Sequence, residues 1–402
     1  MKLDAEQQTQ ILTPAVRRIM DVAREAGGEA RVVGGAVRDV IRGGKIGDID
    51  LASTLPPQRM MEILPAQGIK IVPTGLAHGT VTAVVDHVGY EITTLRHDVE
   101  TDGRRAQVEF TDDWQSDAAR RDFTMNALYA DADGTLYDYF GGAEDARTGH
   151  VRFIGDAEAR IREDVLRILR FFRFYAWFGK GDPDDAALSA CRALANLTPT
   201  LSAERVAKEI LKLLAAENPV AAWRLMMDSG VAAQGAGEAV DIARLSALIE
   251  REQKYAARLD GLARLASLLP ENAATAEKIA ARLKLSNRDG DRLAALAILP
   301  EQLRKNAGAQ GLRRILYAHG AENVQAALFL NEGDIGAALT VIEAWENPLF
   351  PIKGEDIVAS GIPAGPRIGE ILRAVEEWWI AGDFRSSRAA CLAHAAQYGK
   401  NH

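Results

Sequence analysis

The feature of the sequence that most constrains the fold is a change of pattern near residue 157. Before this point, short runs rich in β-branched residues alternate with helical segments, and glycines stand at the junctions. After it, one helical pattern follows another, with start signals at Leu201-Ser202 and Asn218-Pro219 and a stop at Gly230. We therefore expect an α+β fold, in which a mixed sheet with helices precedes an all-helical region.

Several elements of the first part are predicted with definite bounds. Thr13-Pro14 caps a helix that Gly27-Gly28 ends. We expect strands at residues 30–33, 48–52, 80–85 and 89–95, and a short helix at residues 36–41.

Length and composition indicate an ordinary globular protein of more than one domain. The chain has 402 residues, of which 48% are hydrophobic and 26% charged. Residues 1–10 are polar and lack the basic start and apolar run of a signal peptide. Nothing approaches the roughly 18 unbroken apolar residues of a membrane span. We expect a cytoplasmic protein that does not enter a membrane.

The charge is unevenly distributed. The net charge is −8, although affinity for nucleic acid comes largely from lysine and arginine. Residues 151–180 nevertheless carry seven basic residues against four acidic ones. This locally basic strip is compatible with RNA binding, and a solvated helix face is the alternative.

Two carboxylates in the second predicted strand indicate a metal site. Asp48 and Asp50 would share one face of the strand with Cα atoms about 7 Å apart. Mg²⁺ prefers such oxygen ligands together with substrate phosphates, and paired metals stabilise an in-line phosphoryl displacement. Glu91, on a later strand, is a candidate supplementary ligand. A surface strand with two solvated aspartates is the alternative for Asp-x-Asp alone.

A glycine turn lies about a dozen residues before these aspartates. Gly34-Gly35 follows a predicted strand and opens a predicted helix, so backbone amides there could approach a phosphate. Arg38, one helical turn further on, is a candidate clamp for a triphosphate.

Several motifs in the same order resemble a known family. They are residues 34–39 with Asp48-Ile49-Asp50, residues 120–127, Gly141-Gly142, residues 163–170, and in the tail residues 353–356 and 365–369. Together they resemble the class II tRNA nucleotidyltransferases and the bacterial poly(A) polymerases, continuously from about residue 32 to residue 174.

The resemblance implies a seahorse-like arrangement of four parts. These are a mixed-sheet nucleotidyltransferase head (residues 1–150), a neck that recognises the nucleotide base (151–216), a helical body (217–305) and a helical tail that binds tRNA (306–402).

The resemblance also implies residue roles. Asp48 and Asp50 would bind magnesium, and Arg121, Asp122 and Asn126 would contact the ribose and phosphates. Asp164 and Arg167 would read the base, with Glu163 and Arg170 in support. The implied reaction adds C, C and A to the 3′ end of tRNA from CTP and ATP without a template and releases pyrophosphate. Residues 96–107 would correspond to a loop that switches the enzyme from C to A.

The pair that would read the base has a physical rationale. On a helix, Asp164 and Arg167 would project from the same face. Cytosine and adenine each present an amine donor beside a ring-nitrogen acceptor, so the carboxylate would accept and the guanidinium donate. Guanine and uracil present the reverse order. A surface salt bridge between the two is the alternative.

Three other functions stay open. A poly(A) polymerase or an enzyme that adds only CC would share nearly every head residue. Residues 73–80 resemble the CCA-adding version better than the basic element associated with polyadenylation. A catalytically silent RNA-binding protein is the alternative from another class.

Overall fold

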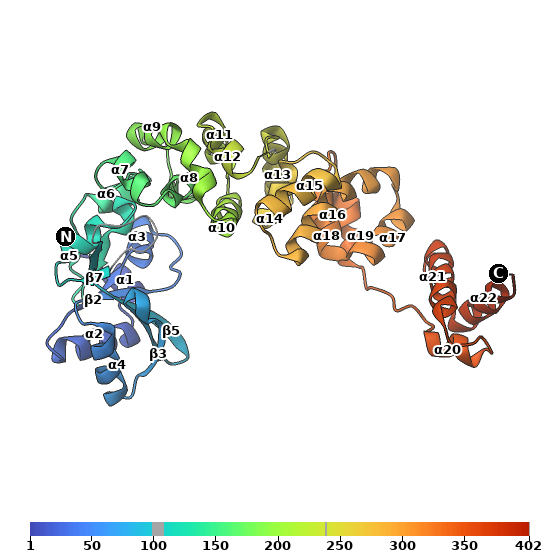
Figure 1. The fold of residues 1–402 in the computed structure, drawn as a ribbon, viewed down its shortest axis with the longest axis horizontal. Helices are drawn as coiled ribbons and strands as arrows, with labels where there is room; N and C mark the ends of the chain where they lie inside the picture. The colour runs from blue at the N-terminus through green and yellow to red at the C-terminus, as the bar shows by residue number, and fades with distance from the viewer. Residues whose placement is uncertain (99–107, 238, 402) are drawn as a thin grey trace. The chain divides into compact units, whose positions relative to one another are not determined.

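The structure, a computed structural model, describes residues 1–98, 108–237 and 239–401 (Figure 1). The chain divides into two compact units, Met1–Gly237 and Glu238–His402. All strands of the described ranges lie in the first unit, and the last of them ends at Asp138. The α+β head followed by helices is therefore confirmed. Most of the predicted switching segment, residues 99–107, lies outside the described residues.

A seven-stranded mixed sheet forms the centre of the first unit, in the order β3-β4-β5-β2-β1-β8-β9. β2 and β5 are parallel, and the other neighbours are antiparallel. The strands of this sheet are β1 (Ala30–Val33), β2 (Asp50–Ser53), β3 (Lys70–Gly75), β4 (Thr80–Val85), β5 (Val88–Thr94), β8 (Leu128–Ala130) and β9 (Leu136–Asp138). A separate ribbon pairs β6 (Arg96–Asp98) with β7 (Val108–Phe110).

The bounds of β1 and β4 agree with the predicted ones, whereas β2 begins two residues later than predicted. β2 begins later because its partner strand, β1, is short. β1 ends at Val33, which pairs with Asp50, because the chain then turns at Gly34 into a helix. Asp48 therefore lies before the strand and not in it, although it is close enough for its charge to raise the pKa of Asp50.

Helices surround this sheet and continue beyond it within the first unit (Figure 1). The head helices are α1 (Ala5–Ile11), α2 (Pro14–Glu25), α3 (Gly35–Arg42), α4 (Pro57–Ala66), α5 (Trp114–Ala119) and α6 (Gly142–Thr148). They are followed by α7 (Ala157–Glu163), α8 (Leu166–Phe178), α9 (Asp185–Ala193), α10 (Ala203–Leu214), α11 (Val220–Asp228) and α12 (Val231–Gly235). As predicted, Thr13 caps α2, since its side chain accepts a hydrogen bond from the Val16 amide.

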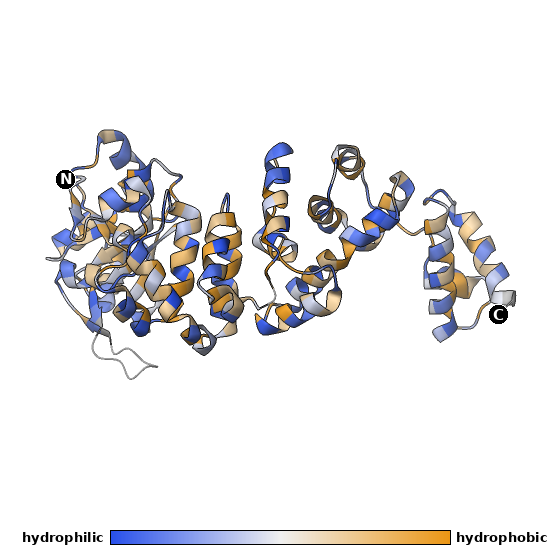
Figure 2. Ribbon diagram, turned by 90° about the horizontal axis from the view of Figure 1, so that it is seen from above, coloured by the Kyte–Doolittle hydropathy of each residue, from blue (hydrophilic) through white to orange (hydrophobic). Residues whose placement is uncertain are grey.

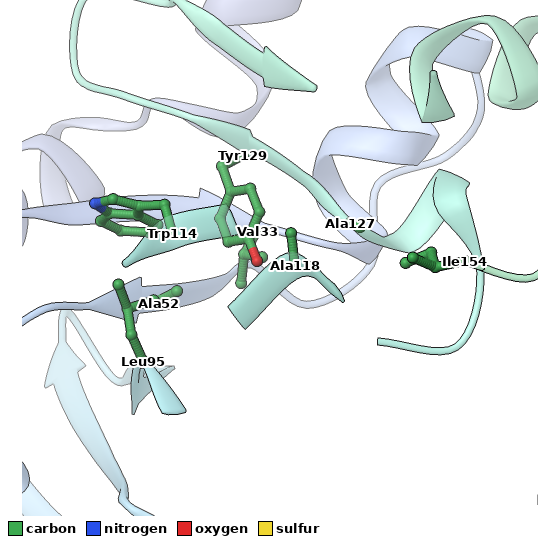
Figure 3. Close-up of a cluster of buried hydrophobic side chains, with 8 residues drawn as sticks. All are labelled: Val33, Ala52, Leu95, Trp114, Ala118, Ala127, Tyr129 and Ile154. Carbon is green, nitrogen blue, oxygen red and sulfur yellow. The ribbon is translucent and has the colours of Figure 1, made fainter. Parts of the chain in front are cut away.

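The head core is built around Tyr129 on β8. Its ring lies 5.3 Å from that of Trp114 in an edge-on arrangement, and both are buried. Val33 on β1, Ala52 on β2 and Leu95 belong to the same buried cluster (Figure 3). Burying an aromatic side chain of this size stabilises the fold by about 2–3 kcal/mol, so the cluster fixes α5 against the sheet.

The second unit consists of helices in its described residues. They are α13 (Ile242–Lys254), α14 (Gly261–Ser267), α15 (Ala273–Arg282), α16 (Asn287–Lys305), α17 (Ala309–His319), α18 (Ala321–Leu330), α19 (Gly336–Glu343), α20 (Gly354–Ala359), α21 (Pro366–Ala381) and α22 (Arg388–Asn401). Hydrophilic and hydrophobic residues alternate along many of them (Figure 2), as expected for helices with one buried face. Trp379 is buried and packs on Tyr317, whereas Trp378 stacks on His394 and is 36% exposed. None of the helices described has the length and apolar character needed to cross a membrane.

Candidate functional site

A pocket of about 640 Å³ lies in the first unit between the head sheet and α8. Its walls come from β1, β2, β5 and the start of α3 on the head side, and from the junction of α7 and α8 and the start of α10 on the other. Most of the predicted site residues line it, namely Gly34, Gly35, Arg38, Asp50, Glu91, Arg121, Asp122, Asn126, Asp164, Arg167 and Arg170. Asp48 and Glu163 do not belong to its lining.

One wall of the pocket is acidic. Leu51 pairs with Ile92 in the parallel register of β2 and β5, so the preceding residues, Asp50 and Glu91, lie side by side. Partial burial and, after it, the negative charges of Glu91 and Asp48 together raise the pKa of Asp50 to about 6. Within the described ranges, no three acidic, histidine or cysteine side chains form a ready cluster for a metal. The acids nevertheless repel one another at a place where a cation would relieve that repulsion.

The turn that opens α3 lies beside this wall. Gly34 has φ +70° and ψ −118°, a backbone conformation that L side chains rarely adopt. A Cβ at this position would meet the Asn126 carbonyl oxygen at 3.5 Å and Arg121 Nη1 at 3.6 Å. The guanidinium of Arg38 donates to both carboxylate oxygens of Asp39 at 2.9 Å. Arg38 thus lines the pocket with part of its hydrogen-bonding capacity already used.

A continuous network connects the head to α8. Arg38 Nη1 donates to Asn126 Oδ1 at 2.7 Å, and Asn126 Nδ2 donates to Asp122 Oδ1 at 2.9 Å. Asp122 then accepts from Arg170 Nε at 2.7 Å. Burial alone would raise the pKa of Asp122, but the charge of Arg170 and the hydrogen bond from Asn126 hold it below its usual value. Four predicted site residues are therefore held in one arrangement.

Asp117 is a buried residue that holds two arginines of the pocket lining, Arg120 and Arg121, and that sequence reasoning missed. Its side chain is 1% exposed and pairs with Arg120 at 2.7 Å and with Arg121 at 3.1 Å. It also accepts from the Tyr129 hydroxyl at 2.8 Å. The i,i+3 and i,i+4 spacing to the two arginines was a signal that could have identified it.

The base-reading pair is not arranged as predicted. α7 ends at Glu163, and Asp164 has extended backbone angles, φ −145° and ψ 103°. The prediction that Asp164 lies on a helix with Arg167 is therefore wrong. The helix is interrupted here because two hydrogen bonds hold another backbone path. Asp164 Oδ1 accepts from the Leu166 amide at 3.1 Å, and Arg167 Nη1 donates to the Arg160 carbonyl at 2.9 Å. Both side chains still line the pocket.

The salt bridge between Asp164 and Arg167 that was the alternative interpretation is not formed; each residue has another partner. Arg167 pairs with Glu163 at 2.8 Å, and Asp164 pairs with Arg205 at 3.0 Å. Arg205 lies on α10 and lines the pocket, yet no spacing in the sequence connects it with Asp164.

Two family models match parts of the first unit. Residues 30–152 match the family described as poly A polymerase head domain, and residues 182–234 match the one described as probable RNA and SrmB-binding site of polymerase A.

Two relatives are similar over nearly their full length. The Mus musculus protein named CCA tRNA nucleotidyltransferase 1, mitochondrial, is 34% identical, covering 98% of this chain and 92% of the relative. A CCA-adding enzyme of Geobacillus thermodenitrificans is 32% identical, covering 95% and 97%.

A solved structure shows the same fold. The Bacillus stearothermophilus CCA-adding enzyme in complex with CTP is 26% identical, with a TM-score of 0.78 over 99% of both chains. The likeness spans nearly the whole chain, and the chain therefore belongs to the family of the CCA tRNA nucleotidyltransferases, the CCA-adding enzymes.

Proposed function

We propose that this enzyme adds C, C and A to the 3′ end of tRNA from CTP and ATP, without a nucleic-acid template, and releases pyrophosphate. One observation carries the proposal: a single pocket holds the acidic wall of the head and, facing it, Asp164 and Arg167. The relatives named CCA tRNA nucleotidyltransferase and CCA-adding enzyme support the same reaction, and the similar solved structure is a complex with CTP.

The family uses a divalent metal ion, and we propose Mg²⁺ held by Asp48 and Asp50, with Glu91 as a supplementary ligand. The donor set fits, because Mg²⁺ is usually bound by one or two carboxylates together with waters and substrate phosphates. When bound, the metal stabilises the charge that develops on the attacking and leaving oxygens.

The remaining head residues position the nucleotide. Gly34 and Gly35 line the pocket at the start of α3, where the helix dipole favours phosphate. The Gly34 amide itself donates to the Leu128 carbonyl at 3.0 Å. We propose that Arg121, Asp122 and Asn126 contact the ribose and phosphates. Catalysis then depends mainly on holding the tRNA 3′ hydroxyl in line with the α-phosphate.

The base is read at the opposite wall. Arg167 Nη1 donates to Glu163 and to the Arg160 carbonyl, and Nη2 donates to the Arg120 carbonyl. A guanidinium has five N–H groups, so these bonds leave Nε–H and one Nη2–H for a ring nitrogen. Asp164 supplies the acceptor for the exocyclic amine. Each correct polar pair gives about 1–3 kcal/mol of discrimination.

The direct test uses tRNA that ends before CCA, incubated with CTP and ATP singly and together, followed by sequencing of the product ends. We expect CC from CTP alone and CCA from both. Long A tails from ATP would identify a poly(A) polymerase, products that stop at CC a CC-only enzyme, and bound but unextended tRNA a silent RNA-binding protein.

Two sets of variants distinguish the residues needed for nucleotide transfer from those that select the base. Asp48→Ala and Asp50→Ala should abolish transfer of every nucleotide, whereas Asp164→Ala should lose selectivity for C and A while keeping tRNA affinity. Turnover retained in both Asp48→Ala and Asp50→Ala would refute the metal assignment. Unchanged nucleotide choice in Asp164→Ala would refute the template role.

We also propose the division into head (1–150), neck (151–216), body (217–305) and tRNA-binding tail (306–402), and a cytoplasmic location. The Mus musculus and Homo sapiens relatives are named mitochondrial, so cell fractionation is the measurement for the location.

A further inference from the structure

Arg205 stands at the start of α10 and reaches across to the residue proposed to read the base amine. Its Nη2 donates to both carboxylate oxygens of Asp164, at 3.0 Å and 3.2 Å. The Asp164 side chain is 39% exposed and that of Arg205 51%, and both line the pocket. The two residues lie 41 positions apart in the sequence.

Asp164 needs such a partner because of where it lies. It belongs to neither α7 nor α8, so helical packing does not hold its side chain. Its Oδ1 accepts from the Leu166 amide at 3.1 Å, which alone leaves the carboxylate free to rotate about that bond. The contact with Arg205 at both oxygens removes this freedom.

We propose that Arg205 is a positioning residue that sets the orientation of the Asp164 carboxylate and thereby the selectivity for C and A over U and G. This inference rests on the proposed function. Each carboxylate oxygen has about two acceptor sites. Oδ1 uses its sites for the Leu166 amide and Arg205, whereas Oδ2 uses one site for Arg205. The second site of Oδ2 accepts the exocyclic amine of the base.

If Arg205 served only to hold α10 against α8, any other contact between these two helices would have the same effect on selectivity. α10 is also tied to α8 by Trp177, whose Nε1 donates to the Lys212 carbonyl at 2.7 Å. Trp177 lies outside the pocket lining. Trp177→Phe therefore loosens the packing of α8 on α10 without touching Asp164 and is the matched control.

The experiment measures kcat/KM for CTP, ATP, UTP and GTP on tRNA lacking CCA, with full-length protein. For Arg205→Ala we expect kcat/KM for CTP and ATP to fall roughly 10- to 100-fold, as for loss of a hydrogen bond to a charged group. The values for UTP and GTP should change much less, so the C-to-U and A-to-G ratios collapse. Arg205→Lys should restore part of the ratios, and Trp177→Phe should leave them unchanged.

An Arg205→Ala enzyme with wild-type ratios would overturn the inference, whatever its overall rate. Ratios that fall equally in Trp177→Phe would overturn it as well. Asp164→Ala, measured in parallel, distinguishes a failure of the base-reading proposal from a failure of the role of Arg205. If its ratios also stay at the wild-type values, the base-reading proposal itself fails. If they collapse while those of Arg205→Ala do not, only the role of Arg205 fails. If Arg205→Ala does not fold, Arg205→Gln gives the same comparison.

Discussion

At the scale of single residues, the pocket depends most on one glycine. Gly34 combines φ +70° with ψ −118°, whereas Gly43, at the other end of α3, has φ +68° and ψ 27°. The second combination is left-handed helical, which other residues adopt at a cost of about 1–2 kcal/mol, while the first is open almost only to glycine.

Gly34→Ala should therefore impair the enzyme more than Gly43→Ala. We expect a loss of stability of about 1–3 kcal/mol and a loss of kcat/KM of roughly tenfold or more, because the turn must shift beside Asn126 and Arg121. Gly43→Ala has nothing within 4 Å of the new Cβ and should lose only stability. Thermal unfolding and steady-state kinetics measure both effects, and equal kinetic losses in the two variants would contradict this role of Gly34.

At the scale of elements, the bond between Asp122 and Arg170 joins the head to α8. Asp122 is 8% exposed, and removing one partner of such a pair costs about 3–5 kcal/mol. Because the folded pKa of Asp122 is lowered, its contribution is fully present above the unfolded value of about 4 and is lost as the pH falls through the folded value.

Asp122→Asn should therefore destabilise the protein at neutral pH, and the difference from the wild type should shrink below about pH 4. Denaturant unfolding over a pH series measures this difference. Asp21→Asn is the control, since Asp21 forms an exposed pair with Arg24 and should change stability by less than about 1 kcal/mol. A difference for Asp122→Asn that stays constant down to pH 3 would rule out the linkage.

Local patterns predicted the elements better than the contacts between them. β1 and β4 follow from β-branched runs ended by turns, and Ser202 precedes α10 as its sequence signal indicated. The break at Asp164 was not predicted, because the local bond from the Leu166 amide acts together with a bond from Arg167 to the carbonyl of Arg120, which is 47 positions away. Arg205 could not be found for the same reason: its partner is near only after α10 folds against α8.

At the scale of the whole molecule, the predicted nucleotide site lies entirely within Met1–Gly237, so the proposed tRNA-binding tail needs a separate test. Of the tail's basic residues, Arg313 is engaged with Asp383 at 2.6 Å and its side chain is 30% exposed. Arg385 also pairs with Asp383, at a longer 3.4 Å, and its side chain is 81% exposed. A phosphate contact in the tail is therefore best sought at Arg385.

Arg385→Ala should weaken tRNA binding and reduce the slope of log affinity against log salt by about one unit, because one fewer counterion is released. The KM for CTP at saturating tRNA should not change, since the nucleotide pocket is built from other residues. Arg24→Ala is the matched control: the Arg24 side chain is 67% exposed but lies in the head. Filter binding across a salt series measures both slopes. If Arg385→Ala keeps the wild-type slope, or if Arg24→Ala reduces it as much, Arg385 is not a phosphate contact and the negative net charge of the chain must be offset by other arginines.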